Sequence, residues 1–416
     1  MIVATRANLW GCRFEPGPCG RVPLLFLAPA TGGGHRSAAL AVSDALERDY
    51  PGRFAPVLCD PLTGPGSPWA VRRLTQMYGP ITRRAPSAWG VLYRASDSAT
   101  TMRGLQWAFF SRSDRFIRAA IDDLHPAIVV SFHALTNEPA VKATRRSQSL
   151  PAVVTVVTDL VTVHHAWHSG EVDCVTAPSA PAAMALRLDG MASERVFETG
   201  LPVATELASG PLAGQDRAGL RRALGLGEKT FVVVVTGGAE GTGHIARQVR
   251  ALAGSGLEDL ELVAICGHNR RLVGKLRRLR VGAGTTRLTT LGFVRNMADW
   301  LRGADVVVTR AGPGILAEAT CAGAAILITS HLPGQEEGNT ELAVAAGAAR
   351  YAPKARDLVR EVERLRHDPN ALTSMRRGSA RLGRPGAAGE VASLLAALVL
   401  PVAGQSDAIE DEVVPA

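Results

Sequence analysis

The same order of elements opens both halves of the chain: an apolar run, a glycine-rich loop that starts with threonine, a histidine and a helix-like stretch. In the first half, residues 22–30 are apolar, Thr31-Gly-Gly-Gly-His35 follows, and an alanine-rich segment continues to Leu46. In the second half, residues 231–235 are followed by a loop from Thr236 to His244. Such runs are typical of strand–loop–helix units. The sequence therefore predicts two similar α/β domains.

Further apolar runs predict parallel sheets in each half, at residues 127–132, 152–157, 174–176, 260–266, 304–309 and 324–329. Strands that alternate with helical stretches imply parallel sheets covered by helices on both faces. We expect domains at residues 22–203 and 204–370, each Rossmann-like. We also expect helices at 371–402 that pack back on the first domain, and an acidic tail at 403–416.

Composition excludes several classes of protein. The apolar runs are shorter than the roughly 20 residues that span a bilayer, and the N-terminus lacks the continuous apolar core of a signal peptide. Six cysteines without a C-x-x-C pair argue against a zinc ribbon or a disulfide scaffold and favour the cytoplasm. The net charge is +8, and 42 of the 46 basic residues are arginine. This bias fits either phosphate recognition or a genome rich in arginine codons.

Residues 62–118 do not follow the strand–helix alternation. Proline and glycine interrupt this segment, which combines aromatic residues with nine arginines and only two aspartates. Basic and aromatic side chains together suit a surface that binds anionic lipid headgroups, and no nucleic-acid motif accompanies them. An ordinary insertion with solvated arginines is the alternative. The candidate membrane residues are Trp69, Arg72, Arg73, Arg83, Arg84 and Trp89.

The first glycine loop is a candidate anion site with a candidate base beside it. Gly33 and Gly34 lie between a predicted strand and a predicted helix, where free backbone N–H groups and the helix dipole attract anions. His35 follows directly, and a neutral imidazole there could remove a proton from a substrate. A purely structural histidine is the alternative.

A second candidate anion site follows the predicted strand at 304–309. Gly312 and Gly314 open a helix, and Glu318 lies one turn further on, where a carboxylate can accept hydrogen bonds from ribose hydroxyls. The spacing formally matches a dinucleotide fingerprint, which would suit a nicotinamide-dependent oxidoreductase. Pro313 within the loop and the late position of the motif in its domain count against that enzyme class.

The loop at 331–339 is rich in amide and carboxylate groups. Gln335, Glu336 and Asn339 combine hydrogen-bond donors and acceptors at short reach, as recognition of sugar hydroxyls requires. Because ligands bind at the carboxyl ends of parallel strands, we expect this loop to be functional. Near the middle of the chain, Asp159 and the histidines of residues 164–168 have metal-ligand types but not a metal-binding pattern, and a cleft-lining strand end is the better interpretation.

Taken together, these motifs resemble those of family 28 glycosyltransferases, in the branch of monogalactosyldiacylglycerol synthases and diacylglycerol glucosyltransferases. The resemblance covers about residues 24–353. The motifs that carry it are Thr31-Gly-Gly-Gly-His35, Ser131-Phe-His133, Thr158-Asp-Leu160 with His164-x-x-Trp167, Gly200-Leu-Pro-Val203, Gly237–Gly243, Ile265-Cys-Gly267, Gly292-Phe-Val-x-Asn-Met297, Ala311-Gly-Pro-Gly314 and Pro333-Gly-Gln-Glu-x-Gly-Asn339.

The resemblance implies a GT-B fold and a role for each matching residue. His35 would be the catalytic base and Glu318 would hold the ribose. The diphosphate would lie against Gly33, Gly34, Gly238, Gly243, Gly312, Gly314 and Arg310; the nucleotide base against Gly267, Phe293 and Val294; and the donor sugar against Gln335, Glu336 and Asn339. Arg310, His268, Asn269 and Thr242 depart from the residues usual in the family, which affects the exact donor and acceptor.

The expected function is therefore the transfer of galactose or glucose from a UDP-sugar to a lipid hydroxyl, with diacylglycerol as acceptor. The resemblance implies an inverting enzyme that needs no cofactor and no metal ion and that docks on the inner face of the cell membrane. A polyprenyl-linked or soluble acceptor is an alternative. A protein that binds nucleotide sugars as a sensor, without transferring them, is another.

Overall fold

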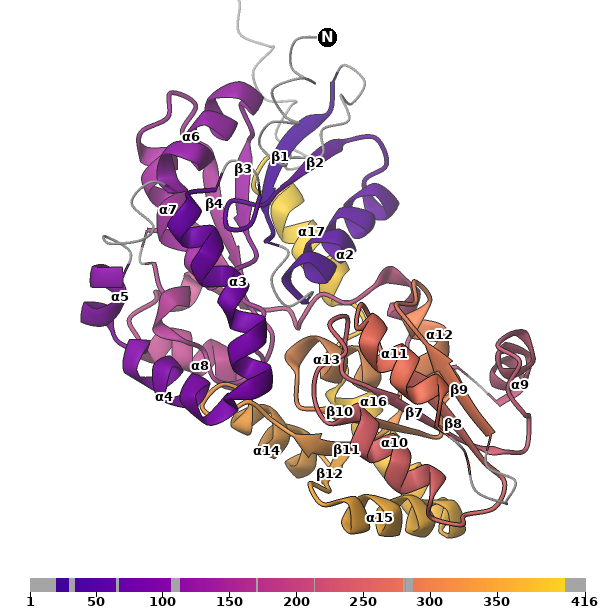
Figure 1. Cartoon of the computed structure of the whole chain (residues 1–416). Helices are drawn as coiled ribbons and strands as arrows, with labels where there is room; N and C mark the ends of the chain where they lie inside the picture. The colour runs from indigo at the N-terminus through magenta and orange to yellow at the C-terminus, as the bar shows by residue number, and fades with distance from the viewer. Residues whose placement is uncertain are drawn as a thin grey trace, which may run out of the picture.

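The computed structural model describes residues 20–400 except 30–33, 65–66, 106–112, 170, 213, 280 and 282–286. Gly33 and the expected acidic tail therefore lie outside the described residues, as do the side chains of Arg83 and Arg84. Two six-stranded sheets form the framework, and every strand pair in both sheets is parallel. The predicted α/β class is confirmed (Figure 1).

The first sheet has the order β2-β1-β3-β4-β5-β6. Its strands are β1 (Val22–Leu27), β2 (Phe54–Cys59), β3 (Ile128–Ser131), β4 (Ala152–Val156), β5 (Cys174–Ala177) and β6 (Val196–Glu198). Alternate residues of β1 enter two separate cores: Leu25 and Leu27 face one, Leu24 and Phe26 the other. This burial on both faces explains why its strands appear in the sequence as continuous apolar runs.

Helices cover both faces of this sheet. One core includes residues of α6 (Ser113–Leu124), α7 (Ala134–Arg145) and α8 (Ala180–Leu188). The other includes residues of α2 (Gly34–Asp49) and of the last helix, α17 (Ala387–Ala397).

The second sheet has the order β12-β11-β10-β7-β8-β9. Its strands are β7 (Phe231–Thr236), β8 (Leu260–Ile265), β9 (Arg287–Leu291), β10 (Val306–Arg310), β11 (Ala325–Ser330) and β12 (Ala349–Tyr351). Its helices are α9 (Gly214–Ala223), α10 (Ile245–Ala253), α11 (Arg270–Arg277), α12 (Met297–Gly303), α13 (Pro313–Cys321), α14 (Glu337–Ala345), α15 (Ala355–His367) and α16 (Pro369–Leu382). In both sheets the loops that follow the strands come from the carboxyl edge, where the motifs of the sequence lie.

The segment between β2 and β3 is helical despite its prolines. It forms α3 (Trp69–Arg84), α4 (Pro86–Ser96) and α5 (Ala99–Leu105) before α6 begins. Pro86 occupies the first turn of α4, where a missing N–H is not needed, whereas Pro80 lies inside α3. Figure 1 shows α3 running along the first domain toward the second, with α4 close to α14.

The chain returns to the first domain at its end. Helices are expected to pack back on the first domain over residues 371–402, and in the structure α17 does so, whereas α16 packs on the second sheet. Met375 of α16 lies in a core of the second sheet, whereas Leu395 of α17 lies in the core shared by β1 and α2. The Tyr50 hydroxyl, just after α2, donates a hydrogen bond to Ser393 Oγ of α17 at 3.4 Å. Figure 1 shows α17 beside α2.

Within the described residues, we find no helix that is both long enough and apolar enough to cross a bilayer.

Candidate active site

The candidate site lies where the carboxyl edges of the two sheets meet. Helix α2 begins at Gly34 in the first domain, and α13 begins at Pro313 in the second. A Cβ atom placed on Gly314 would lie 3.9 Å from the Cα of Gly34. The N-termini of the two helices therefore approach each other across the domain boundary, and their free N–H groups create a positive potential there.

His35 lies in the first turn of α2 and is half-buried. Its Nδ1 is 2.7 Å from Thr158 Oγ1, and its ring centroid is 4.4 Å from that of His133. Burial lowers the pKa of His35 to about 4, although a hydrogen bond with the Phe132 backbone opposes the change. The imidazole is therefore neutral at pH 7, which is the form that can accept a proton.

Asp159 follows β4 and joins the two domains. Its Oδ2 accepts a hydrogen bond from Trp167 Nε1 at 2.7 Å, and its Oδ1 accepts one from Gln335 Nε2 at 3.4 Å. Burial raises the pKa of Asp159 to about 6, against the effect of these two hydrogen bonds. The ring of Trp167 in turn lies 6.4 Å from that of His35, between centroids. Asp159 thus lies between the candidate base and the candidate sugar loop.

Glu336 is engaged by the protein itself. Its Oε1 pairs with Arg310, and its Oε2 accepts a hydrogen bond from the Leu332 backbone at 2.9 Å. Arg310 also lies against the α13 N-terminus, because a Cβ atom on Gly312 would be 3.2 Å from its guanidinium carbon. The pair therefore holds the loop of residues 331–336 against the start of α13.

Asn339 of α14 and Glu318 of α13 are two further predicted site residues with polar side chains. Asn339 Nδ2 donates to the Ala311 carbonyl at 3.0 Å, whereas its Oδ1 is buried without a hydrogen-bond partner among the described residues. Glu318 is half-buried, and burial raises its pKa to about 7. Gly312 is the N-cap of α13 and Pro313 its first residue, so Gly314 and Ile315 supply the helix's first free N–H groups.

The second glycine loop packs on the end of β8. A Cβ atom on Gly267 would overlap the Ala239 carbonyl, and one on Gly243 would lie 3.9 Å from Arg310 Cβ. Gly238 has a φ of 75° and donates to Thr236 Oγ1 at 3.3 Å. Gly243 therefore lies beside Arg310, and Gly238 and Gly267 lie against each other at the same carboxyl edge.

An aromatic pair lies at the ends of β8 and β9. The rings of His268 and Phe293 are stacked, with centroids 4.4 Å apart and planes 9° from parallel. Phe293 is 52% exposed, and Val294 packs at the edge of the second domain's core. This stack offers a flat apolar face to a nucleotide base.

The candidate membrane residues divide into two groups. Trp69 is 72% exposed on α3, Arg73 is exposed one turn later, and Arg72 is half-buried. Trp89 lies elsewhere: its Nε1 donates a hydrogen bond to Gln335 Oε1 at 3.2 Å, so it contacts the second domain. Tyr78 of α3 also lies near Arg310 and Glu336, where burial raises its pKa to about 12.

The three histidines after β4 do not all come together, because His164 lies apart from His165 and His168. His164 Nε2 lies 3.1 Å from Ser96 Oγ, at the end of α4. His165 Nδ1 and His168 Nε2 instead lie 3.6 Å and 2.8 Å from Asp189 Oδ2. Within the described part of the chain, no three His, Cys, Asp or Glu residues form a group suited to a metal ion.

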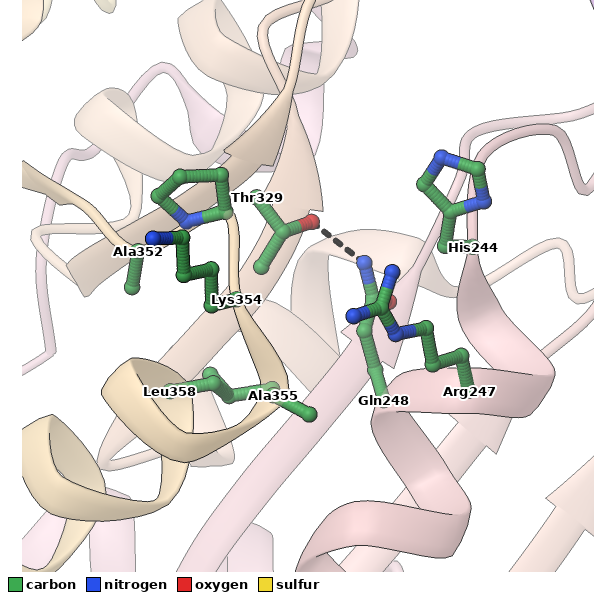
Figure 2. Close-up of a pocket in the computed structure, with 9 residues that line it drawn as sticks. His244, Arg247, Gln248, Thr329, Ala352, Lys354, Ala355 and Leu358 are labelled. Atoms are coloured by element: carbon green, nitrogen blue, oxygen red, sulfur yellow. Dashed lines mark hydrogen bonds between the residues drawn. The ribbon is translucent and has the colours of Figure 1, made fainter.

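A small hollow lies between α10 and the start of α15 (Figure 2). Gln248 donates to the Thr329 hydroxyl, which itself donates to the Thr309 carbonyl at 3.2 Å. His244, Arg247 and Lys354 surround this contact, and the hollow contains none of the predicted site residues. Its hydrogen bonds connect α10 to β11 and β10, so they support the framework behind the candidate site.

Comparison with known proteins agrees with these observations. Residues 35–203 match the family model of monogalactosyldiacylglycerol (MGDG) synthase, and residues 232–391 match the glycosyltransferase family 28 C-terminal domain. A probable monogalactosyldiacylglycerol synthase 2 of Oryza sativa subsp. japonica is 30% identical over 84% of this chain and 76% of its own length. The chain belongs to glycosyltransferase family 28, in its monogalactosyldiacylglycerol synthase group.

Other relatives are consistent with this membership. A probable monogalactosyldiacylglycerol synthase of Glycine max is 29% identical over 88% of this chain and 69% of its own length. Among solved structures, Acinetobacter baumannii MurG covers 90% of this chain and 98% of its own, with a TM-score of 0.57 at 18% identity. HepE of Anabaena, solved with UDP and glucose, covers 90% of this chain and 100% of its own, with a TM-score of 0.54 at 14% identity. The fold is GT-B, as the resemblance implied.

Several residues at the site escaped prediction from the sequence. The sequence predicts a cleft-lining strand end and a family motif around Thr158, Asp159 and Trp167 but assigns no role to these residues, and it places Tyr78 in an aromatic-rich segment without a role. A signal was present for the first two, because polar residues directly after a buried parallel strand lie at the ligand edge of the sheet. Nothing local in the sequence marks Tyr78 or the contact of Trp89 with Gln335.

Proposed function

We propose that this protein transfers a hexose, galactose or glucose, from a UDP-sugar to the hydroxyl of diacylglycerol, with inversion at the anomeric carbon. The observation that carries the proposal is a neutral, half-buried His35 in the first turn of α2, directly after Gly34, which lies against the N-terminus of α13 across the domain boundary. This arrangement brings a base and an anion-binding helix end to one place, as a displacement of diphosphate requires. The family membership and the UDP-bound structural neighbour support the donor class.

In the proposed reaction, the diphosphate lies on the N–H groups at Gly314 and Ile315. The His35 imidazole removes the proton from the lipid hydroxyl, whose oxygen forms a bond to the anomeric carbon. The bond from that carbon to the diphosphate oxygen breaks on the opposite side, and UDP leaves with the electron pair. Arg310, held beside Gly312, adds positive charge where negative charge develops. The reaction so described uses neither a metal ion nor a cofactor.

The nucleotide and sugar are assigned to the remaining groups of the second domain. The uracil lies against the stacked rings of Phe293 and His268, and Glu318 accepts hydrogen bonds from the ribose. Gln335 and Asn339 bind hydroxyls of the hexose. Glu336 acts indirectly, because both of its oxygens already hold the loop to Arg310 and Leu332. The donor is thus assigned to residues 204–370, and the acceptor to residues 22–203.

The acceptor side is assigned to the membrane surface. The exposed face of α3 carries Trp69, Arg73 and Met77 at helical spacing, which combines apolar and basic side chains. Such a face suits reversible docking on a bilayer with anionic lipids, at the cytoplasmic side where UDP-sugars are available. Trp89 is not part of this surface.

The test is an assay with labelled UDP-galactose and UDP-glucose, vesicles that contain diacylglycerol and anionic phospholipid, and EDTA. We expect a β-linked hexosyl diacylglycerol, and a fall in kcat of about 10²–10⁴-fold in His35→Ala with UDP affinity unchanged. Near-normal turnover of that variant would contradict the base assignment. Saturable UDP binding without any product would favour a sensor. Vesicle binding that does not depend on the content of anionic lipid would contradict the membrane assignment.

A further inference from the structure

A chain of hydrogen bonds with a fixed direction crosses the domain boundary. Trp89 Nε1 donates to Gln335 Oε1 at 3.2 Å, and Gln335 Nε2 donates to Asp159 Oδ1 at 3.4 Å. From the other end, Trp167 Nε1 donates to Asp159 Oδ2 at 2.7 Å. An indole N–H can only donate, so Trp89 and Asp159 together decide which end of the Gln335 amide faces which neighbour.

The packing around Trp89 keeps this contact in place. Its ring lies edge-on to that of Tyr78, with centroids 4.9 Å apart. One residue later, a Cβ atom on Gly90 would be 2.8 Å from Pro333 Cβ, so α4 lies directly on the loop that carries Gln335. Arg94, one turn further along α4, pairs with Glu337 at 3.6 Å. The loop is therefore supported from the first domain, as well as from its own.

We propose that Trp89 and Asp159 are positioning residues that fix the Gln335 amide for recognition of the donor hexose. This inference rests on the proposed function, in which Gln335 binds the sugar. A carboxamide has two lone pairs on oxygen and two N–H groups. Trp89 engages one lone pair of the Gln335 oxygen, and Asp159 engages one N–H of its nitrogen. One lone pair and one N–H then remain for hexose hydroxyls, with the positions of acceptor and donor fixed. This arrangement selects between hexoses whose hydroxyls point in different directions.

Substitution Trp89→Phe is the direct test, because it keeps an aromatic ring against Tyr78 while it removes the N–H donor together with part of the indole. We expect KM for the UDP-hexose to rise about 3- to 10-fold, as loss of one neutral hydrogen bond predicts. The preference between UDP-galactose and UDP-glucose should fall by a similar factor. The Kd of UDP alone and kcat should stay within about twofold. A general loosening of the domains would instead weaken UDP and UDP-hexose alike, and that result would overturn the proposal.

A double-mutant cycle of Trp89 and Gln335 is the second test of the positioning role. In a Gln335→Ala background, Trp89→Phe should cause no further rise in KM, because the amide that it orients is gone. Additive effects would overturn the proposal. In Asp159→Asn, a single oxygen replaces the two that accept from Trp167 Nε1 and Gln335 Nε2, so this substitution should also raise KM for the UDP-hexose. Trp300→Phe is the matched control: that indole lies in the core of the second domain and should leave KM and donor preference unchanged.

Calorimetry separates this proposal from the proposed function. If the wild-type protein transferred no hexose to any lipid, the proposed function would fail, yet the Kd values of UDP and UDP-hexose would still measure the effect of Trp89→Phe. A wild-type enzyme that makes hexosyl diacylglycerol while Trp89→Phe retains its KM and donor preference would overturn the positioning role alone.

Discussion

At the scale of single residues, burial moves two neighbouring groups of the site in opposite directions. It lowers the pKa of His35 to about 4 and raises that of Asp159 to about 6, because in each case the charged form loses water. Near neutral pH the base is uncharged and Asp159 is mostly ionised. The charge of Asp159 is retained by its two N–H donors, Trp167 and Gln335.

We predict that the His35 imidazole stays neutral down to a pH well below the usual pKa of a histidine. Protonation removes the lone pair, so activity that depends on His35 is lost only as the pH falls toward 4. At pH 5 about 90% of His35 should be neutral, against about 3% for a histidine with an ordinary pKa. Ring NMR titration, with the signal assigned by its absence in His35→Ala, measures this directly. A midpoint near 6.5 would contradict the prediction.

A change in donor KM with a midpoint near pH 7 would come from Glu318, and one with a midpoint near pH 6 would come from Asp159. Its carboxylate gains a proton as the pH falls through about 6, while His35 does not change. Asp159→Asn should therefore remove the change near pH 6 and leave the His35 titration midpoint where it is. The two assignments are thus tested by different readouts of one pH series.

At the scale of elements, α4 of the first domain lies directly against the loop that carries Gln335. Gly90→Ala would place a methyl group 2.8 Å from Pro333 Cβ and 3.0 Å from its carbonyl oxygen, so the helix must move away. We expect KM for the UDP-hexose to rise about 3- to 10-fold as the Trp89 contact weakens. Alanine otherwise favours a helix over glycine by about 1 kcal/mol, so the loss arises from the interface.

The control for this prediction lies on the next helix. A Cβ atom on Gly104 of α5 would meet nothing within 4 Å. Gly104→Ala should therefore stabilise its helix, as alanine does relative to glycine, and keep the wild-type KM. Steady-state kinetics and thermal unfolding of the two variants provide the comparison. If Gly90→Ala kept the wild-type KM, the close contact between α4 and the loop would have no role in donor binding.

The elements themselves were predictable where they are buried on both sides. The central strands β1, β3, β4 and β5, and β7, β8, β10 and β11, match the apolar runs of the sequence. The runs did not mark the edge strands β2, β6, β9 and β12, which pair on one side only. β6 and β12 are three residues long, and β9 has no fully buried residue, so a continuous apolar pattern is not needed there.

The candidate site followed the same rule. Glycine loops and His35 were predictable because a local pattern marks them, and the second domain's motifs lie together at one edge. The partners of Gln335 were not predictable, because Trp89 precedes it by 246 residues and Asp159 by 176. No local pattern encodes a contact across that distance, and an aromatic residue in an arginine-rich segment looks the same whether it faces a membrane or another domain.

At the scale of the whole molecule, the chain crosses between the domains twice, and α17, its last described helix, packs on the first domain. α17 belongs by sequence to the end of the chain, yet Leu395 lies fully buried in the core with Leu24 of β1 and Val42 of α2. Arg384 pairs with Glu198 at 2.8 Å just before this helix. The stability of the acceptor domain therefore depends on residues that are synthesised after the donor domain.

We predict that Leu395→Ala destabilises the first domain by about 2–5 kcal/mol, the cost of a cavity at a buried leucine. Leu398→Ala removes the same atoms from a side chain that is 42% exposed, so it should cost less than about 1 kcal/mol. Denaturant unfolding measures both values. Hydrogen exchange should accelerate in α2 and β1 of Leu395→Ala, far from the substitution in sequence, because these elements share its core. If exchange accelerated only within α17, this helix would not contribute to the stability of the first domain, which would contradict the prediction.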